Sequence, residues 1–297
     1  MPVSVERRSP WWPSGSSTVV GVMGDPIGHS LSPLLHNAAF DALGLDWVSV
    51  AFEVPAGQAA VALAGAVALG LAGLSVTMPH KQQAAAAVDE RSAVAEHLGA
   101  VNCVTIAHGR LHGDSTDGAG FLAALSRQHG FDPSGRSCLV VGAGGAARAV
   151  ILALSGAGAG EVVVVNRHHG RAAEAAALAG GRGRVGTVDD VAGVDLVVQA
   201  TPVGMVGASP EAEVLPGARF HGAQVVIDIV YRPSTTALLE RAAATGARVG
   251  NGLGMLVHQA ALAVEHWTGL EVPVEAMWSA AGAASGPGAL GPPPGPR

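Results

Sequence analysis

The sequence predicts two α/β units in series. Short β-branched runs alternate with segments of helical spacing from Thr18 onward, and the alternation restarts at Ser137. A chain of 297 residues is long enough for two ordinary domains, each with its own core. Ala and Gly supply much of the 49% hydrophobic content, so we expect the helices to pack closely through small side chains.

The first half of the chain alternates strand and helix three times. The expected elements are a strand over 18–24, a helix over 33–43, a strand over 46–54, a helix over 57–70, a strand over 73–77 and a helix over 80–88. This order favours a mainly parallel sheet that helices cover on both faces. The segment 101–114 then predicts a hairpin that turns at His108 and Gly109, and a helix over 118–128 follows.

The second half repeats the alternation. The expected elements are a strand over 137–142, a helix over 145–155, a strand over 161–166, a helix over 169–179 and strands over 195–201 and 224–230. Two helical segments after Gly252 have no strand after them, so we expect them to pack back on the first unit.

Composition and charge limit the classes of partner. The formal net charge of −6, from 17 basic and 23 acidic residues, gives no reason to expect nucleic acid or an anionic membrane as a general partner. The two cysteines, Cys103 and Cys138, lie far apart and lack metal-ligand spacing. Neither a disulfide framework nor a metal site is therefore expected, and a reducing, cytoplasmic location fits.

One stretch has almost the length of a membrane span. Residues 56–74 are uncharged and nearly long enough to cross a bilayer. Ala and Gly dominate this stretch, and its end is better explained as a buried strand, so we expect no membrane segment. The ends of the chain, 1–16 and 282–297, are expected to be tails outside the two units.

A glycine pattern stands between a strand and a helix of the second half. In CLVVGAGGAARAVILAL the pattern G-x-G-x-x-A falls on Gly142, Gly144 and Ala147. Glycine permits a tight turn and lets the backbone approach a pyrophosphate, while the helix N-terminus offers unpaired N–H groups. The pattern alone is weak evidence in a chain with 42 glycines. The strand that follows completes the order of a dinucleotide-binding unit, which favours this interpretation over an ordinary turn.

The next strand ends at Asn166 and Arg167, where an NAD-binding unit usually carries an acid for the ribose 2′-OH. Arg167, with Arg171 one turn later, suggests a clamp for a 2′-phosphate, because guanidinium groups pair well with phosphate oxygens. This favours NADP over NAD. The alternative is an ordinary solvated arginine at a strand end.

The stretch GHSLSPLLHN carries two serines ahead of a predicted helix. Ser32, followed by Pro33, is a good helix start on local grounds, with the serine as the cap. Ser30 and Ser32 could equally bind a carboxylate at the helix N-terminus, since both hydroxyls can donate. The residues alone leave both interpretations open.

Three further polar residues have competing explanations. Lys81 follows a predicted strand at the sheet edge where ligands usually lie, but it could be a solvated residue at a helix start. Asp117 could be the N-cap or a first-turn acid of its helix, and Asn102 could simply start a strand. Taken singly, a structural role is the simpler explanation of each.

Taken together, the segments resemble the shikimate dehydrogenase family. From about Val20 to Gly269 the chain carries, in the family's order and rough spacing, the motifs GDPIGHSLSP, LSVTMPHK, GAVNCV, GDSTDG, VVGAGGAARA, NR, ATPVGM and NGLGMLVHQA. The resemblance implies an N-terminal α/β substrate-binding domain, a C-terminal Rossmann-like NADP-binding domain and a cleft between them. The domains would comprise residues 17–116 with 253–281, and residues 117–252.

The resemblance also implies an activity, the NADP-dependent reduction of 3-dehydroshikimate to shikimate in aromatic amino acid biosynthesis, by a monomer or homodimer. It places the substrate carboxylate on Ser30 and Ser32, and it makes Lys81 and Asp117 the catalytic pair. The other matched substrate positions, which bind ring hydroxyls or lie near the carboxylate, are Thr77, Asn102, Gln259 and Tyr231. The matched cofactor positions are Gly142, Ala143, Gly144, Gly145 and Ala146 for the pyrophosphate, Asn166, Arg167 and Arg171 for the adenosine phosphate, and Thr201, Ile229, Gly252 and Met255 for the nicotinamide end.

The chemistry requires a proton donor beside the reacting oxygen. Hydride transfer to the 3-ketone leaves an alkoxide that must be protonated. We expect Lys81 to donate this proton and Asp117 to hold the ammonium and a substrate hydroxyl. Which of the two moves the proton stays open.

Three positions depart from the family pattern. His168 follows Arg167 where Thr is frequent, Gln199 stands where Asn is common, and Arg232 stands where Asn often follows the tyrosine. These changes concern specificity more than reaction type, so a quinate/shikimate or aminoshikimate dehydrogenase paralogue remains an alternative. A non-catalytic NADPH-sensing protein on the same fold is the alternative from another class, and the presence of both Lys81 and Asp117 argues against it.

Overall fold

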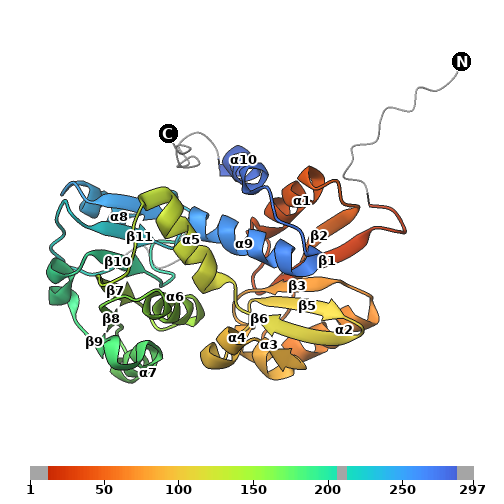
Figure 1. Ribbon diagram of the computed structural model, residues 1–297, viewed down its shortest axis with the longest axis horizontal. Coiled ribbons are helices and arrows are strands. Elements are labelled where there is room, and N and C mark those ends of the chain that lie inside the picture. The colour runs from red at the N-terminus through yellow and green to blue at the C-terminus, as the bar shows by residue number, and fades with distance from the viewer. Residues whose placement is uncertain (1–12, 206–212, 286–297) are drawn as a thin grey trace, which may run out of the picture. The chain divides into compact units, whose positions relative to one another are not determined.

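The computed structural model describes residues 13–205 and 213–285, and these divide into two compact units (Figure 1). The first unit contains the described residues up to Ser115 together with Ala260–Ala284, and the second contains the described part of Thr116–Gln259. The prediction of two α/β units in series is confirmed. Of the expected tails, residues 1–12 and 286–297 lie outside the described residues, whereas 282–285 continue the helix that begins at Val274.

The first unit is built on a six-stranded mixed sheet in the order β2-β1-β3-β5-β6-β4. Its strands are β1 (Thr18–Gly24), β2 (Trp47–Glu53), β3 (Gly73–Val76), β4 (Glu90–Arg91), β5 (Cys103–Ala107) and β6 (Arg110–Asp114). β1 pairs in parallel with β2 and β3, whereas β5 runs antiparallel to β3 and β6. The hairpin turns at His108 and Gly109, as predicted, and both have positive φ (52° and 75°).

The helices α2 (Ala59–Ala68), α3 (Lys81–Ala87) and α4 (Ala93–Leu98) contribute to an aliphatic core that includes Leu63, Leu74 and Val101. The other helices of this unit are α1 (Ser32–Ala42), the C-terminal part of α9 (Leu253–Thr268) and α10 (Val274–Ser285). The return of α9 is anchored by Trp267, whose indole Nε1 donates to the carbonyl of Val104 at 3.0 Å. A side chain at Gly73 would meet this indole at 2.3 Å, so the glycine makes room for it.

The second unit is a six-stranded, wholly parallel sheet in the order β12-β11-β10-β7-β8-β9. Its strands are β7 (Ser137–Val141), β8 (Glu161–Val165), β9 (Gly183–Val185), β10 (Leu196–Gln199), β11 (Val225–Asp228) and β12 (Arg248–Asn251). The strand order reverses between β7 and β10, and in open parallel sheets ligands bind at the carboxyl ends of the strands at such a point.

The helical segments of this unit are α5 (Asp117–His129), α6 (Gly145–Gly156), α7 (His169–Ala176), α8 (Ala237–Ala243) and the 3-10 segments η1 (Ala177–Arg182) and η2 (Val188–Gly193), with the first part of α9. The core is rich in fully buried Val, Leu and Ala, because a parallel sheet is covered on both faces.

Several predicted elements are shorter than expected. The strand expected over 224–230 comprises only Val225–Asp228, and the helix expected over 57–70 comprises Ala59–Ala68. The helix expected over 169–179 leaves the α conformation after Ala176, and Gly180, at φ 58°, breaks the regular geometry of η1. The strand expected over 195–201 ends at Gln199, whose side chain binds the amide N–H of Thr201 in place of a neighbouring strand. Within 56–74 the helix α2 has 10 residues, and no helix in the described parts of the chain is long and apolar enough to cross a membrane.

Candidate functional site

Three predicted site residues of the first unit, the substrate positions Thr77 and Asn102 and the catalytic Lys81, are linked through the main chain at one edge of its sheet. The carbonyl of Asn102 accepts from the N–H of Val76 at 2.7 Å, next to Thr77. The carbonyl of Lys81 accepts from the N–H of Val101, the residue before Asn102, at 2.9 Å. The structure therefore brings Thr77, Lys81 and Asn102 together beyond the carboxyl end of β3, where a parallel sheet offers a ligand site.

Lys81 is half-buried and occupies the first position of α3. It is the only lysine in the chain. A cation at a helix N-terminus faces the positive end of the helix dipole, so helix stability does not explain it.

The two serines lie at the start of α1, beyond the carboxyl end of the neighbouring strand β1. Their loop is joined to the β3–α3 loop by the N–H of Asp25, which donates to the carbonyl of Met78 at 3.0 Å. The prediction that Ser32 caps the helix is wrong. Leu31 occupies the N-cap position without a side-chain cap, and the Ser30 hydroxyl accepts from the N–H of Ser32 at 3.2 Å. Ser32, as the first helical residue, points its own N–H into this local turn.

Asp117 and Gln259 lie in the second unit on two helices that cross closely. Asp117 is buried at the first position of α5, and Thr116 at the N-cap makes no side-chain cap bond. One turn later, a side chain at Gly120 would meet the backbone N of Gln259 at 2.6 Å, so the glycine allows α5 and α9 to touch. The Gln259 side-chain amide donates to the carbonyl of Leu256 at 2.9 Å. Lys81 belongs to the first unit and Asp117 to the second, so their pairing stays a prediction.

The glycine turn after β7 has the geometry that the sequence predicts for a phosphate-binding turn. Gly142 has φ 117°, and a side chain there would meet the carbonyl oxygen of Ala200 at 2.8 Å, so only glycine fits. Gly144 is the exposed N-cap of α6, with open space where a side chain would be and no side-chain cap on the helix. The first N–H groups of α6 are thus left for an anion.

Ile229 and Gly252 lie in direct contact beyond the carboxyl ends of β11 and β12. The N–H of Gly252 donates to the carbonyl of Val230 at 3.2 Å, and a side chain at Gly252 would lie 1.8 Å from the carbonyl oxygen of Ile229. Ile229, Met255 and Ala143 all pack against the same core cluster of this unit. The predicted nicotinamide and pyrophosphate positions therefore share one edge of the sheet.

Asp228, at the end of β11, is a buried acid that the sequence analysis did not single out, and its hydrogen bonds fix the chain at this edge of the sheet. The Asp228 carboxylate accepts from the N–H of Val230 at 3.0 Å and from the hydroxyl of Thr236 at 2.7 Å. Burial raises the pKa of Asp228 to about 6, against the smaller lowering effect of these two hydrogen bonds. The signal in the sequence was an acidic residue within the otherwise apolar predicted strand 224–230.

The predicted adenosine-phosphate residues follow β8. The Asn166 amide donates to the carbonyl of His168 at 3.1 Å, which shapes the turn into α7. Arg167 and Arg171 are exposed, and neither has an ion pair or hydrogen bond with any other described residue. Both guanidinium groups are free to meet an anion.

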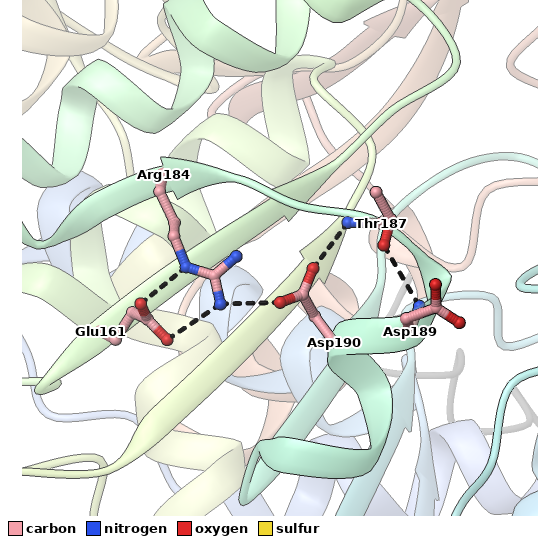
Figure 2. A network of polar contacts seen from close by, with 5 residues as sticks. All are labelled: Glu161, Arg184, Thr187, Asp189 and Asp190. Atoms are coloured by element: carbon pink, nitrogen blue, oxygen red, sulfur yellow. Dashed lines mark hydrogen bonds and ion pairs between the residues drawn. The ribbon is translucent and has the colours of Figure 1, made fainter.

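The turn after the next strand, β9, lies beside this segment and is fixed by a network of ionic contacts (Figure 2). The Arg184 guanidinium bridges Glu161, at 2.7 Å from Nε, and Asp190, at 2.8 Å from Nη2. The Asp190 carboxylate also accepts from the N–H of Thr187 at 2.7 Å. The bond from Arg184, together with that N–H, lowers the pKa of Asp190. The side chains of this network are half-exposed, so its ion pairs contribute little to the stability of the fold. Their role is to fix the conformation of the turn.

The described residues contain no group of three or more His, Cys, Asp or Glu side chains that could hold a metal ion. The second unit, with its reversed strand order, glycine turn and uncapped helix, has the architecture of a dinucleotide-binding α/β unit. The fold and site define an α/β protein of two units. The second unit is of the dinucleotide-binding kind, and the first unit gathers polar residues at one edge of its own sheet.

The chain belongs to the shikimate dehydrogenase family. The family model for the shikimate dehydrogenase substrate binding domain matches residues 22–104. The model for shikimate / quinate 5-dehydrogenase matches residues 124–229, and that for the shikimate 5'-dehydrogenase C-terminal domain matches residues 252–281.

Individual relatives agree with this assignment. The shikimate dehydrogenase (NADP(+)) of Methanopyrus kandleri is 45% identical over 271 residues, which cover 88% of this chain and 93% of that protein. Among solved structures, shikimate 5-dehydrogenase from Thermus thermophilus in complex with NADP(H) and shikimate has a TM-score of 0.81 and 39% identity, over 89% of this chain and 98% of that one. Quinate dehydrogenase from Corynebacterium glutamicum in complex with NAD has a TM-score of 0.80 and 33% identity, over 89% and 98%.

Proposed function

We propose that this chain reduces 3-dehydroshikimate to shikimate with NADPH. The observation that carries the proposal is the convergence of Thr77, Lys81 and Asn102 on one sheet edge of the first unit. The second unit supplies a glycine turn of the required geometry. The curated relatives named as NADP(+) shikimate dehydrogenases cover most of the chain, which supports the same substrate and cofactor.

The proposed NADP-binding domain comprises residues 117–252, all within the second unit where the structure describes them. Gly142 to Ala146 and the N-terminus of α6 would hold the pyrophosphate, because their N–H groups are open to an anion. Asn166, Arg167 and Arg171 would hold the 2′-phosphate, and Thr201, Ile229, Gly252 and Met255 would line the nicotinamide end. NADPH, when bound, supplies the hydride.

The proposed substrate-binding domain comprises residues 17–116 and 253–281, and it corresponds to the first unit except that residues 116 and 253–259 belong to the second unit. Ser30 and Ser32 would bind the carboxylate, since both hydroxyls lie at the start of α1 and can donate to an anion. Thr77, Asn102 and Gln259 would bind the ring hydroxyls, and Tyr231 would lie near the carboxylate.

Lys81 is the proposed proton donor. Its ammonium would give a proton to the oxygen of the reduced ketone and would take it back in the reverse reaction. The Asp117 carboxylate would orient the ammonium and hold an adjacent hydroxyl of the substrate, which fixes the reacting carbon in place. The protein would act in the cytoplasm as a monomer or homodimer, and light scattering on the purified chain distinguishes these two assemblies.

The experiment that tests this function measures initial rates with shikimate and quinate, each with NADP and with NAD. The proposal predicts the highest kcat/KM for shikimate with NADP. A strong preference for quinate with NAD would contradict it and would favour the quinate dehydrogenase alternative. An aminoshikimate arm tests the remaining paralogue, and NADPH binding without turnover on any of these substrates would favour a cofactor-sensing protein.

A further inference from the structure

Gln199 is a fully buried polar residue at the last position of β10. The strand lies in the middle of the parallel sheet of the second unit, between β7 and β11. Burial of a side-chain amide is unfavourable unless its donors and its acceptor find partners. The reason for a glutamine at this position therefore lies in the groups that it binds.

All the bonds of this side chain go to the loop that leaves the sheet after β10. The amide nitrogen donates to the carbonyl of Thr201 at 2.9 Å and to that of Val203 at 3.0 Å. The amide oxygen accepts from the N–H of Thr201. The loop adds one bond of its own, from the N–H of Val203 to the Thr201 hydroxyl at 3.3 Å. A single side chain thus sets the backbone path from Thr201 to Val203.

The loop that Gln199 shapes packs directly on the glycine turn. A side chain at Gly142 would meet the carbonyl oxygen of Ala200 at 2.8 Å and the methyl group of Thr201 at 3.2 Å. The main chain on both sides is fixed as well, because the N–H of Ala200 donates to the carbonyl of Val141 at 2.8 Å. The turn after β7 and the loop after β10 therefore form one continuous wall at the point where the strand order reverses.

We propose that Gln199 is a positioning residue for the dinucleotide site: its amide holds Thr201 against the glycine turn at Gly142 before any ligand binds. The inference rests on the proposed NADP(H) function. A loop that is ordered in advance loses little conformational freedom on binding, which raises the affinity for the ligand. The residue acts through Thr201 and the backbone, without touching the cofactor itself.

The same sheet contains a matched residue at its opposite edge. Gln224, just before β11, is also fully buried. Its amide nitrogen donates to the carbonyls of Val191 at 2.6 Å and Val194 at 2.9 Å, and its oxygen accepts from the N–H of His221 at 3.0 Å. Gln224 has the same burial and the same set of bonds, but it lies at the amino ends of the strands, away from the ligand edge.

This pair allows a direct experiment. The variants Gln199→Met and Gln224→Met keep the length of the side chain and remove its hydrogen bonds, and both are expected to destabilise the fold. We expect Gln199→Met to weaken NADPH binding by about tenfold or more, because a displaced loop no longer matches the ligand. The binding is measured by the fluorescence of NADPH. The KM for NADPH should rise more than that for 3-dehydroshikimate. Gln224→Met should keep the wild-type affinity and KM values.

Two outcomes would overturn the proposal. One is a wild-type NADPH affinity in Gln199→Met. The other is an equal loss of affinity in both variants, since that would be a general consequence of lower stability. If the wild-type protein does not bind NADPH, the proposed function fails, and amide hydrogen exchange still decides the role of Gln199. Exchange should rise at Thr201 and Val203 in Gln199→Met, and at His221 in Gln224→Met.

A measurement on the wild-type protein keeps the proposal testable if Gln199→Met does not fold. In the ligand-free protein the Thr201 and Val203 amides should be protected from exchange to the same degree as the His221 amide. Exchange at these two amides at the rate of an unstructured loop would overturn the proposal.

Discussion

The imidazole of His36 stands edge-on to the indole of Trp267, with ring centroids 5.0 Å apart and the ring planes at 83°. His36 is fully buried on α1, and its Nδ1 is hydrogen-bonded to the hydroxyl of Ser49 at 3.0 Å. This contact joins the helix that begins at the two serines to the returning helix α9. Desolvation by burial lowers the pKa of His36 to about 3, so the ring is neutral in the folded protein.

The first prediction concerns acid stability. The unfolded chain takes up a proton on His36 near pH 6.5, and the folded chain does not. The contribution of the neutral ring to the free energy of unfolding is therefore fully present above pH 6.5 and is lost as the pH is lowered toward 3. Between pH 7.5 and pH 5 this group alone should remove about 2 kcal/mol from the free energy of unfolding. Urea denaturation of His36→Gln should lack this loss. The exposed His97→Gln should keep it, and an identical pH dependence in His36→Gln and wild type would contradict the assignment.

The second prediction concerns Asp228, whose effect has the opposite sign. Its folded pKa of about 6 lies above the ordinary value of 3.8, so the folded state holds the proton more tightly and stability falls as the pH rises from 4 to 6. The loss should reach about 3 kcal/mol above pH 6. Asp228→Asn should abolish this part of the pH profile in chemical denaturation. Thr236→Val removes a hydrogen bond to the ionised carboxylate, so the decrease in stability should extend to higher pH. An unchanged pH profile in both variants would contradict this account.

The third prediction separates the two glycines of the turn. Gly142→Ala forces a side chain into φ 117° and against Ala200, so it should lower the free energy of unfolding by about 1–3 kcal/mol. Gly144→Ala meets open space and should change stability by less than about 1 kcal/mol. Its methyl group lies at the exposed start of α6, so it should weaken NADPH binding instead. Thermal denaturation and NADPH titration of both variants check the prediction, and equal stability losses would contradict it.

The fourth prediction concerns the choice between NADP and NAD. Arg167→Ala should raise the KM for NADPH by about tenfold, because a charge-assisted bond to the 2′-phosphate is lost, and should leave the KM for NADH unchanged. Arg127 is an exposed arginine on α5, and Arg127→Ala serves as the control for loss of charge. An equal rise in both KM values for Arg167→Ala would show that this arginine does not read the phosphate.

The sequence predicts the architecture well where local pattern decides it. Alternating β-branched and helical segments predicted β1, β2 and β3 with their helices, and the hairpin was placed at the correct turn. The sequence analysis did not predict β4, α4, β9, α8 or β12. β4 has two residues and α4 has six, so neither carries a periodic signal. β4 forms by pairing with β6, and α4 packs on these two strands.

For the candidate site too, the sequence identified the residues that belong to local motifs but not the features that depend on tertiary packing. Motif residues such as Gly142 and Lys81 were found by their type and place beside strands. The cap assigned to Ser32 was wrong because Leu31 takes the N-cap position, a detail of one or two backbone angles. The bonds of Gln199 to its loop and the burial of Asp228 depend on tertiary packing, and the sequence showed these residues only as a departure from the family pattern and as an acid in a strand.

The central claim of the proposed function is that Lys81, the only lysine in the chain, donates the proton to the reduced ketone. The most direct test measures turnover and NADPH affinity together in Lys81→Ala and Lys81→Arg. Arginine keeps the positive charge but does not release its proton. We predict that turnover falls by about 10²- to 10⁴-fold in both variants while NADPH still binds with wild-type affinity. Near-normal turnover in Lys81→Ala would contradict the account.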